Sequence, residues 1–102
     1  MTQATEKKTP SWLDISDEGV TVTFKYPTEL NAVKVGKVFM RPPSVRDLRA
    51  AEAGAKGDAE AREMSLFSSL TEVGEKDLVG LKLLDYRRLQ EGYFRLVDED
   101  EL

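Results

Sequence analysis

Two consecutive prolines near the middle of the chain constrain its fold more than any other feature. Pro42 and Pro43 follow an apolar run that is typical of a strand. Proline lacks a backbone N–H and forces the preceding residue into an extended conformation, so Arg41 and Pro42 cannot be helical. Ser44 then stands at the N-cap position of a helix, with Asp47 three residues later as in a reciprocal capping box. The chain is therefore predicted to be extended before this joint and helical after it.

Before the joint, apolar and polar residues alternate as they do in antiparallel strands. Residues 12–15 indicate a short first strand, which the turn-rich residues 16–19 connect to a second one. The apolar residues that share one face of the second strand are Val20, Val22, Phe24 and Tyr26. That face is predicted to be buried. We expect Pro27 to end the strand, because proline cannot donate to a central ladder.

A further extended run covers residues 33–41, after a loop over residues 28–31. The apolar residues change from one face of this run to the other at Gly36. Since a slip of one residue exchanges the two faces of a strand, Gly36 marks either a β-bulge or the turn of a tighter hairpin.

After the joint, apolar residues recur at helical spacing in four segments. Ser44 caps the first helix, and Asp58 caps a second that Gly74 ends. A short third helix covers residues 75–83, and Asp85 caps the fourth. The residues expected to face the core are Val45, Leu48 and Ala51 or Glu52 in the first helix, Met64, Leu66, Phe67, Leu70 and Val73 in the second, and Leu78, Leu81 and Leu84 in the third. The apolar stripe of the fourth helix consists of Tyr86, Leu89, Tyr93, Leu96 and Val97, and Phe94 widens it.

These elements predict a single α+β domain over residues 12–97. It consists of a small N-terminal antiparallel β-hairpin or three-stranded meander over residues 12–41, followed by a three- to four-helix bundle over residues 44–97. Residues 1–11 are polar and are expected to be disordered, and residues 98–102 form an acidic tail. With 102 residues, the chain is long enough for a modest core but not for an enclosed cleft between two lobes.

The composition excludes most kinds of catalytic and metal site. The chain contains no cysteine and no histidine, which removes disulfides, thiol nucleophiles, the usual general base and the commonest metal ligand. We therefore expect no cofactor, no metal and no enzymatic activity. A hydrophobic share of 40% and a charged share of 33% are typical of a soluble globular domain. No apolar run approaches the roughly 20 residues of a membrane span, so a cytoplasmic protein without a membrane partner is expected.

Two aspartates are candidates for a catalytic or metal-binding pair. Asp77 and Asp85 could form a carboxylate pair for metal binding or acid–base chemistry. Both stand at predicted helix starts, where the helix dipole favours aspartate, so a capping role is expected for each. The acidic run at residues 98–101 lacks the fixed ligand spacing of a calcium loop.

The net charge of −4 is unevenly distributed. Residues 20–49 carry six basic and two acidic residues, whereas residues 50–102 carry seven and thirteen. Basic residues interleaved with aromatic ones could bind single-stranded nucleic acid. The basic residues of the first region are Lys25, Lys34, Lys37, Arg41, Arg46 and Arg49. Because alternation places Phe24 and Tyr26 on the face opposite Lys25, these aromatics are expected in the core, and a nucleic-acid partner is the weaker alternative.

The last helix carries more large apolar residues than a short bundle needs. If the sheet and the other helices do not cover all of them, the remainder form a patch of the kind that marks a partner surface. The alternative is that they complete the core, and the periodicity does not decide between the two. The candidate partner-binding residues are Tyr93, Phe94, Leu96 and Val97.

Three short motifs carry a resemblance to a known family. Arg41-Pro42-Pro43-Ser44 closes the last extended run, Asp47-Leu48 opens the first helix, and Asp85-Tyr86 opens the final helix. The pattern resembles the tail assembly chaperones of Mu-like and P2-like contractile-tailed phages, in which threonine usually stands at the place of the serine. The likeness covers roughly residues 20–97. Structural rather than catalytic roles are expected for Arg41, Pro42, Pro43, Ser44, Asp47 and Asp85.

The resemblance implies a non-enzymatic function. Such a protein would bind the long tape measure protein during tail assembly, keep it soluble, and be displaced as tail tube subunits polymerise. It would act in the host cytoplasm and be absent from the finished virion, and a longer product would arise by ribosomal frameshifting. A homo-oligomer stays open. The alternatives from other classes are a small nucleic-acid-binding regulator and a structural tail or baseplate component.

Overall fold

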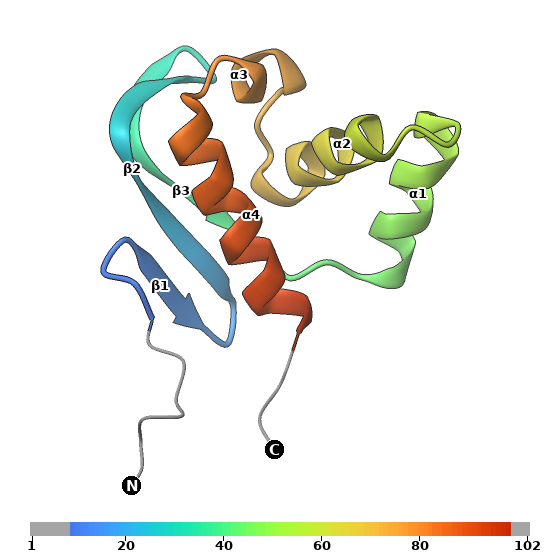
Figure 1. Cartoon of the computed structure of the whole chain (residues 1–102), viewed down its shortest axis with the longest axis horizontal. Helices are drawn as coiled ribbons and strands as arrows, with labels where there is room; N and C mark the ends of the chain where they lie inside the picture. Colours follow the sequence, from blue (N-terminus) through green and yellow to red (C-terminus); the bar gives the residue numbers. More distant parts are fainter. Residues whose placement is uncertain (1–8, 99–102) are drawn as a thin grey trace, which may run out of the picture.

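The computed structural model describes residues 9–98 (Figure 1). A three-stranded antiparallel meander precedes four helices, which confirms the predicted α+β architecture. The elements are β1 (Leu13–Ser16), β2 (Gly19–Leu30), β3 (Val33–Met40), α1 (Val45–Ala55), α2 (Ala59–Thr71), α3 (Glu75–Val79) and α4 (Leu83–Val97). The predicted disordered and acidic tails fall largely on residues 1–8 and 99–102, which lie outside the described residues.

The strand order is β1-β2-β3, so each strand pairs with its neighbour in the chain. Gly19 begins β2 with a φ of 147°, a conformation that L side chains rarely adopt. A Cβ at this position would collide with the backbone oxygen of Met40 and lie 2.7 Å from Cζ of Phe39. Glycine is therefore required where β2 starts between its two partners.

The prediction that Pro27 ends the second strand is wrong. β2 continues through Pro27 to Leu30, and the connection to β3 consists of Asn31 and Ala32. Both turn residues have positive φ values, 53° and 68°, as in the two-residue turns that match the twist of a hairpin. The loop predicted over residues 28–31 is thus mostly strand.

An irregularity in the β2–β3 ladder explains why the strand tolerates a proline. Thr23 pairs with Lys37 and Thr28 pairs with Val35, so four residues of β2 lie opposite Gly36 alone. The register shift therefore falls at Gly36, as in the bulge alternative, although the extra residues belong to β2. The alternative of a turn at Gly36 is wrong, and Pro27 lies where no regular ladder bond is needed.

The same shift changes the exposure of an aromatic side chain. Val20, Val22 and Phe24 are buried as predicted, whereas Tyr26 is 44% exposed. Because Tyr26 lies within the irregular segment, it does not continue the alternation that buries Phe24. The prediction that Tyr26 faces the core is wrong.

The helices form two groups (Figure 1). The long helix α4 lies across one face of the sheet and packs on β2, whereas α1 and α2 form a pair on the opposite side of α4 from β1. α1 packs mainly on α2, and α2 in turn contacts α3 and β3. No helix within residues 9–98 has the length and apolar character needed to cross a membrane.

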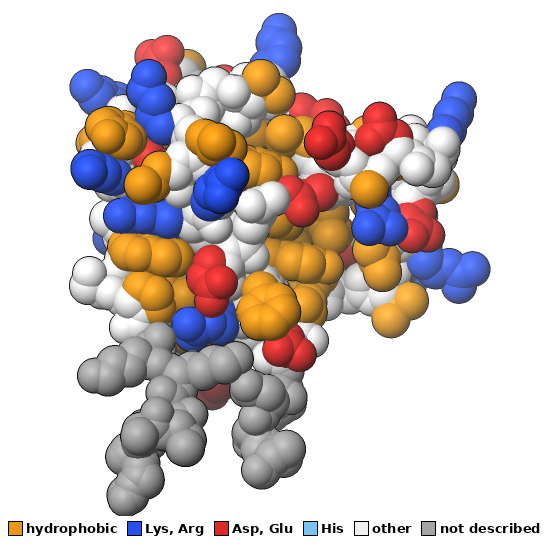
Figure 2. All heavy atoms as spheres, in the orientation of Figure 1, with side chains coloured by type: hydrophobic (Ala, Val, Ile, Leu, Met, Phe, Trp, Pro, Cys, Tyr) orange, Lys and Arg blue, Asp and Glu red, His pale blue; other side chains and the backbone are white. Residues whose placement is uncertain are grey.

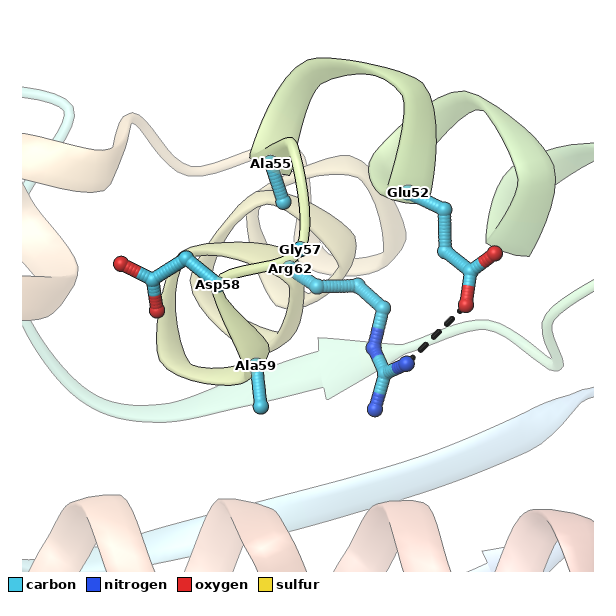
Figure 3. Close-up of a pocket in the computed structure, with 6 residues that line it drawn as sticks. All are labelled: Glu52, Ala55, Gly57, Asp58, Ala59 and Arg62. Carbon is cyan, nitrogen blue, oxygen red and sulfur yellow. Dashed lines mark hydrogen bonds and ion pairs between the residues drawn. The ribbon is translucent and has the colours of Figure 1, made fainter.

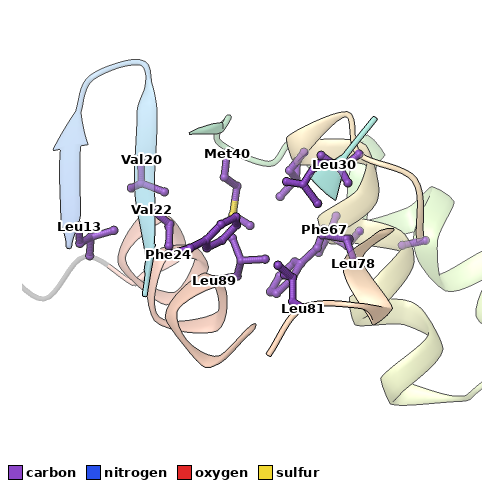
Figure 4. Packing of buried hydrophobic residues seen from close by; sticks show 14 residues of the cluster. Leu13, Val20, Val22, Phe24, Leu30, Met40, Phe67, Leu78, Leu81 and Leu89 are labelled. Carbon is purple, nitrogen blue, oxygen red and sulfur yellow. The ribbon is translucent and has the colours of Figure 1, made fainter. Parts of the chain in front are cut away.

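One hydrophobic core joins the sheet to α2, α3 and α4 (Figure 4). Its buried residues are Leu13, Val20, Val22, Phe24, Leu30, Met40, Ala51, Leu66, Phe67, Leu70, Val73, Leu78, Leu81 and Leu89. The closest approach is at Gly92, where a Cβ would lie 3.2 Å from a methyl group of Val20 and of Val22. The absence of a side chain at residue 92 therefore lets α4 lie close against β2 without displacing these valines.

Three helical residues that were predicted to be buried are exposed. Val45 is 74% and Leu48 is 39% exposed, because the prolyl joint holds α1 away from the sheet and only Ala51 of this helix is buried. The third helix ends at Val79 rather than residue 83, and Leu84 is 43% exposed. Leu81 enters the core from the extended connection, which leaves Leu84 on the outer side of α4.

Candidate partner-binding surface

The joint between β3 and α1 is fixed by one carboxylate. The Arg41 guanidinium donates two hydrogen bonds to Asp47, from Nη1 to Oδ2 at 2.8 Å and from Nη2 to Oδ1 at 3.1 Å. The predicted capping box is present: the Asp47 amide donates to the Ser44 hydroxyl, and the Ser44 amide donates to the Asp47 carboxylate. These bonds lower the pKa of Asp47, with the Arg41 bond the largest cause, and the same bond raises the pKa of Arg41.

The joint also connects the sheet to α2. Pro42 and Pro43 follow Arg41 in a segment without regular structure, and the Arg41 amide donates to the carbonyl of Leu70 at the end of α2. The start of α1 is therefore tied both to the sheet and to α2. The side chains of Arg41, Ser44 and Asp47 are all engaged in these bonds.

Asp85 is not the helix cap that the sequence suggested. Lys82 occupies the N-cap position of α4, and Asp85 lies within the first turn of the helix, fully buried. Its two carboxylate oxygens accept hydrogen bonds from the backbone amides of Lys25 at 2.8 Å and Tyr26 at 3.0 Å. These amides belong to the irregular part of β2, where the ladder offers them no partner. Asp85 thus replaces the missing strand bonds and fastens α4 to the sheet.

The other candidate carboxylate, Asp77, has a similar task. Its side chain accepts a hydrogen bond from the backbone amide of Asn31, in the turn between β2 and β3, at 2.8 Å. Asp77 and Asp85 are therefore each bonded to backbone amides of the hairpin rather than to each other. Within residues 9–98, no group of acidic side chains is arranged to hold a metal ion.

The candidate residues at the end of α4 divide into two pairs. Tyr93 and Leu96 are partly buried against the core, and the Tyr93 ring lies 5.4 Å from the Phe67 ring. Phe94 and Val97 are 45% and 50% exposed. Tyr93 and Leu96 thus help to complete the core, whereas Phe94 and Val97 lie at the surface.

Aromatic and polar side chains connect α2 to α4 beside this surface. The Tyr86 ring lies 5.7 Å from Phe67, and the Tyr86 hydroxyl donates to Glu63 at 2.7 Å. Burial, followed by the interaction with Glu63, raises the pKa of the Tyr86 hydroxyl above its ordinary range. Gln90 donates to the same carboxylate oxygen at 2.8 Å. Glu63 therefore attaches α4 to α2 through the partly buried Tyr86 and through Gln90 at the surface.

The outer side of α4 carries a regular row of exposed residues. Its members recur at intervals of three or four and are Leu83, Arg87, Gln90, Phe94 and Val97. Figure 2 shows hydrophobic side chains gathered over α4 and toward the α1–α2 pair, and Lys and Arg side chains interleaved with them near the start of α4. We call this row the outer row of α4. Three of its five members are apolar, and its first three members line an open hollow together with residues of α2.

A hollow of about 220 Å³ lies at the α1–α2 junction (Figure 3). Arg62 and Glu52 form an ion pair at 3.0 Å across it. The Asp58 carboxylate caps α2 by accepting from the amides of Glu60 and Ala61, as predicted. Because these charged groups already have partners, the hollow is a by-product of the tight connection between two helices.

The prediction that the aromatic residues of the basic strand region lie in the core is correct for Phe24 and wrong for Tyr26. Phe24 is buried, while Tyr26 and Phe39 are 44% and 45% exposed. The Lys25 ammonium lies 5.6 Å from the centre of the Tyr26 ring. An exposed aromatic residue therefore lies beside a lysine, contrary to the prediction that alternation separates them.

The chain matches a family model over residues 21–98, and the family is described as "Phage tail assembly chaperone proteins, E, or 41 or 14". The chain belongs to this family. Neither the search of curated proteins nor the search of solved structures found a match. The matched region extends from the β2 strand to the end of α4, so it includes the joint, the Asp85 contact and the outer row. The predicted family is thereby confirmed, whereas the Mu-like or P2-like subtype stays a prediction. A role in phage tail assembly follows from membership of the chaperone family.

Proposed function

We propose that this phage tail assembly chaperone binds the tail tape measure protein and keeps it soluble while the tail assembles. Its action is non-enzymatic, through an apolar surface. It works in the host cytoplasm, tail tube subunits displace it as they polymerise, and it does not remain in the finished virion. The observation that carries this proposal is the exposure of Phe94 and Val97 on a helix whose opposite side is fully docked.

The geometry of α4 suits a helical client. Phe94 and Val97 are three residues apart and lie on the same side of the helix, with Leu83 three to four turns away in the same row. An amphipathic helix exposes its own apolar stripe at the same spacing and can lie along such a surface. Burying side chains of this size on binding contributes on the order of 1.5–3 kcal/mol each.

Tyr93 and Leu96 support this surface from beneath. Tyr93 packs on Phe67, and Leu96 lies against the core, so changing either would disturb the fold as well as the surface. A test of binding therefore has to change Phe94 and Val97 and leave the supporting pair intact.

The test is co-expression of the chain with the tape measure protein of the same phage. The double variant Phe94→Ser/Val97→Ser should lose capture of the tape measure protein and leave it in the insoluble fraction. Val79→Ser is the matched control, because Val79 is 68% exposed on α3, which adjoins the start of α4 rather than the end that carries Phe94 and Val97. Circular dichroism should show both variants folded.

Two outcomes would contradict the proposal. If the Phe94/Val97 double variant still captures and solubilises the tape measure protein like the wild type, the end of α4 is not the binding surface. If the chain is found in purified phage particles at a fixed ratio to tail tube subunits, it is a structural component rather than a chaperone that leaves.

A further inference from the structure

A second surface feature adjoins the outer row at the start of α4. An open hollow of about 500 Å³ is lined by Trp12, Leu83, Leu84, Arg87 and Arg88. We call it the Trp12 hollow. Leu83 and Leu84 are 63% and 43% exposed, which is high for leucines on a helix that packs on a sheet. Periodicity did not reveal this hollow, because its lining comes from segments about 70 residues apart in the chain.

The floor of the Trp12 hollow is held in place before any partner binds. The Arg88 guanidinium lies 5.0 Å from the centre of the Trp12 ring, and its Nη1 donates to the carbonyl of Thr23 at 2.8 Å. A cation over an aromatic ring and a backbone hydrogen bond together fix both side chains. A preorganised surface loses less conformational entropy on binding than a mobile one.

The charge of the Trp12 hollow is of one sign. Both charged residues that line it are arginines. The side chain of Arg87 is exposed and has no hydrogen bond or ion pair with any residue in the range 9–98. Along α4 the nearest carboxylates are already engaged, Asp85 by backbone amides and Glu91 by Arg95. On its other side, Arg87 lines a neighbouring hollow with Glu60 and Glu63 of α2, and Glu63 already accepts hydrogen bonds from Tyr86 and Gln90. The Trp12 hollow is therefore basic on a chain whose net charge is −4.

The N-cap residue of α4 is also basic. Lys82 occupies that position and is exposed. A positive charge at a helix N-terminus interacts unfavourably with the helix dipole. The helix dipole therefore does not account for the lysine at this position, and a basic surface of this kind favours an acidic partner.

We propose that the Trp12 hollow binds a carboxylate-bearing amphipathic helix of the client, with an apolar side chain against Trp12 and the leucines and an aspartate or glutamate beside Arg87. In assigning that helix to the tape measure protein, the inference rests on the proposed function. Arg87 belongs to the outer row that also contains Phe94 and Val97. At 1.5 Å per residue, Leu83 and Val97 lie roughly 21 Å apart, so one client helix reaches from the hollow to the apolar end.

This arrangement gives the client a defined direction along α4. Its apolar residues contact Phe94 and Val97 at one end, and its acidic and apolar residues fill the hollow at the other. A client helix placed in reverse would lack a carboxylate opposite Arg87. The recognised segment is therefore expected to carry its acidic residues two to three turns from one end of its apolar stripe.

The chain contains its own reporter for this site. Trp12 is the only tryptophan, so intrinsic tryptophan fluorescence reports directly on occupancy of the hollow. The probes are two synthetic helical peptides of about 18 residues, a length that matches α4. Both have the same leucine stripe, and the stripe is flanked by glutamate in one peptide and by lysine in the other.

The glutamate peptide should change the Trp12 fluorescence and bind at least about tenfold more tightly than the lysine peptide. Raising the ionic strength should reduce this difference, because salt screens exposed charges. Arg87→Glu should reverse the preference. Arg49→Glu is the matched control, because it makes the same change of charge on α1, on the far side of the molecule from β1 (Figure 1).

Three results would overturn the inference. One is equal binding of the two peptides, and another is an unchanged preference in the Arg87→Glu variant. The third is a concentration-dependent dimer that Arg87→Glu dissolves and that deletion of residues 98–102 also dissolves. In that case a second copy of this chain occupies the hollow through its acidic residues.

Capture of the tape measure protein separates this inference from the proposed function. If Phe94→Ser/Val97→Ser abolishes capture while Arg87→Glu binds like the wild type, the inference fails and the proposed function stands. If the wild type does not capture the tape measure protein, the proposed function fails. An Arg87-dependent change of Trp12 fluorescence with the glutamate peptide would then still support the acidic specificity of the hollow.

Discussion

The amphipathic helices α1 and α4 are buried to very different degrees. α4 lies across the sheet and buries Asp85, Leu89 and Gly92, whereas α1 buries only Ala51 and leaves Val45 and Leu48 exposed. Both show apolar residues at helical spacing, so their sequences predict similar helices. The difference comes from the contacts that each makes with the rest of the chain.

This contrast shows what an apolar stripe determines. The stripe specifies which face of a helix is turned toward other atoms, but it does not specify whether the chain itself supplies those atoms. For α4 the sheet supplies them on the inner side, through close approach at Gly92 and the bonds of Asp85. For α1, the prolyl joint directs the helix away from the sheet, and mainly α2 remains to cover it.

The largest effect is expected from truncating equivalent leucines in the two helices. Leu89 is fully buried in α4 and Leu48 is 39% exposed in α1. Leu89→Ala should lower the free energy of unfolding by about 2–5 kcal/mol, because it removes a buried side chain and leaves a cavity. Leu48→Ala should cost less than about 1 kcal/mol. Urea unfolding followed by circular dichroism measures both, and similar losses would mean that α1 is as embedded as α4.

The second largest effect concerns carboxylates that each accept two backbone amides. Asp85 is buried and bonds to a distant strand, whereas Asp58 is exposed and caps α2 locally. Asp85→Asn leaves one buried amide facing an NH₂ group, which should cost about 2–4 kcal/mol. Asp58→Asn should cost only a few tenths of a kcal/mol, because asparagine is an equally good N-cap. Equal losses in urea unfolding would refute the idea that Asp85 fastens α4 to β2.

Replacing a glycine by alanine should change the stability of the protein in opposite directions in the two helices. At Gly92 in α4, a Cβ would be 3.2 Å from methyl groups of Val20 and Val22, whereas at Gly54 in α1 no atom lies within 4 Å of it. Gly54→Ala should raise the stability by about 0.5–1 kcal/mol through helix propensity. Gly92→Ala should lower it by about 1 kcal/mol, because overpacking of 1–3 kcal/mol exceeds that gain. Thermal unfolding gives the sign of each change. If both variants are stabilised, the valines of β2 can move enough to accommodate a side chain at residue 92.

The features that the sequence predicted are those set by near neighbours in the chain. Ser44 with Asp47, and Asp58 with the amides that follow it, form caps within three residues, so their pattern can be read directly. The order of strands and helices followed from the same local signals. The alternation of Val20, Val22 and Phe24 likewise predicted their burial.

The features that the sequence did not predict depend on contacts between distant residues. Asp85 looked like a cap because its partners Lys25 and Tyr26 lie about 60 residues earlier. Pro27 looked like a strand end because the register shift that accommodates it depends on the pairing with β3. The Trp12 hollow needs β1 and α4 to lie together, and no local period encodes that proximity.

The smallest effect is expected at the joint that holds α1. In the native state the Arg41 and Ser44 bonds lower the pKa of Asp47, so its ionised form is favoured by folding. Its contribution is therefore fully present above the ordinary aspartate pKa of about 3.9 and is lost as the pH falls through the lowered native pKa. Asp47→Asn removes this contribution, so wild type and variant should differ at neutral pH and converge on acidification.

Asp17→Asn is the matched control for this pH dependence, since Asp17 lies in the turn between β1 and β2 and forms no hydrogen bond or ion pair within residues 9–98. Free energies of unfolding measured from pH 7 downward should show a pH-dependent gap for Asp47→Asn alone. Amide hydrogen exchange should place the loss in α1, with α4 unaffected, because the joint holds the helix that the sheet does not cover. Faster exchange in α4 as well would mean that the two helices unfold together despite their different contacts.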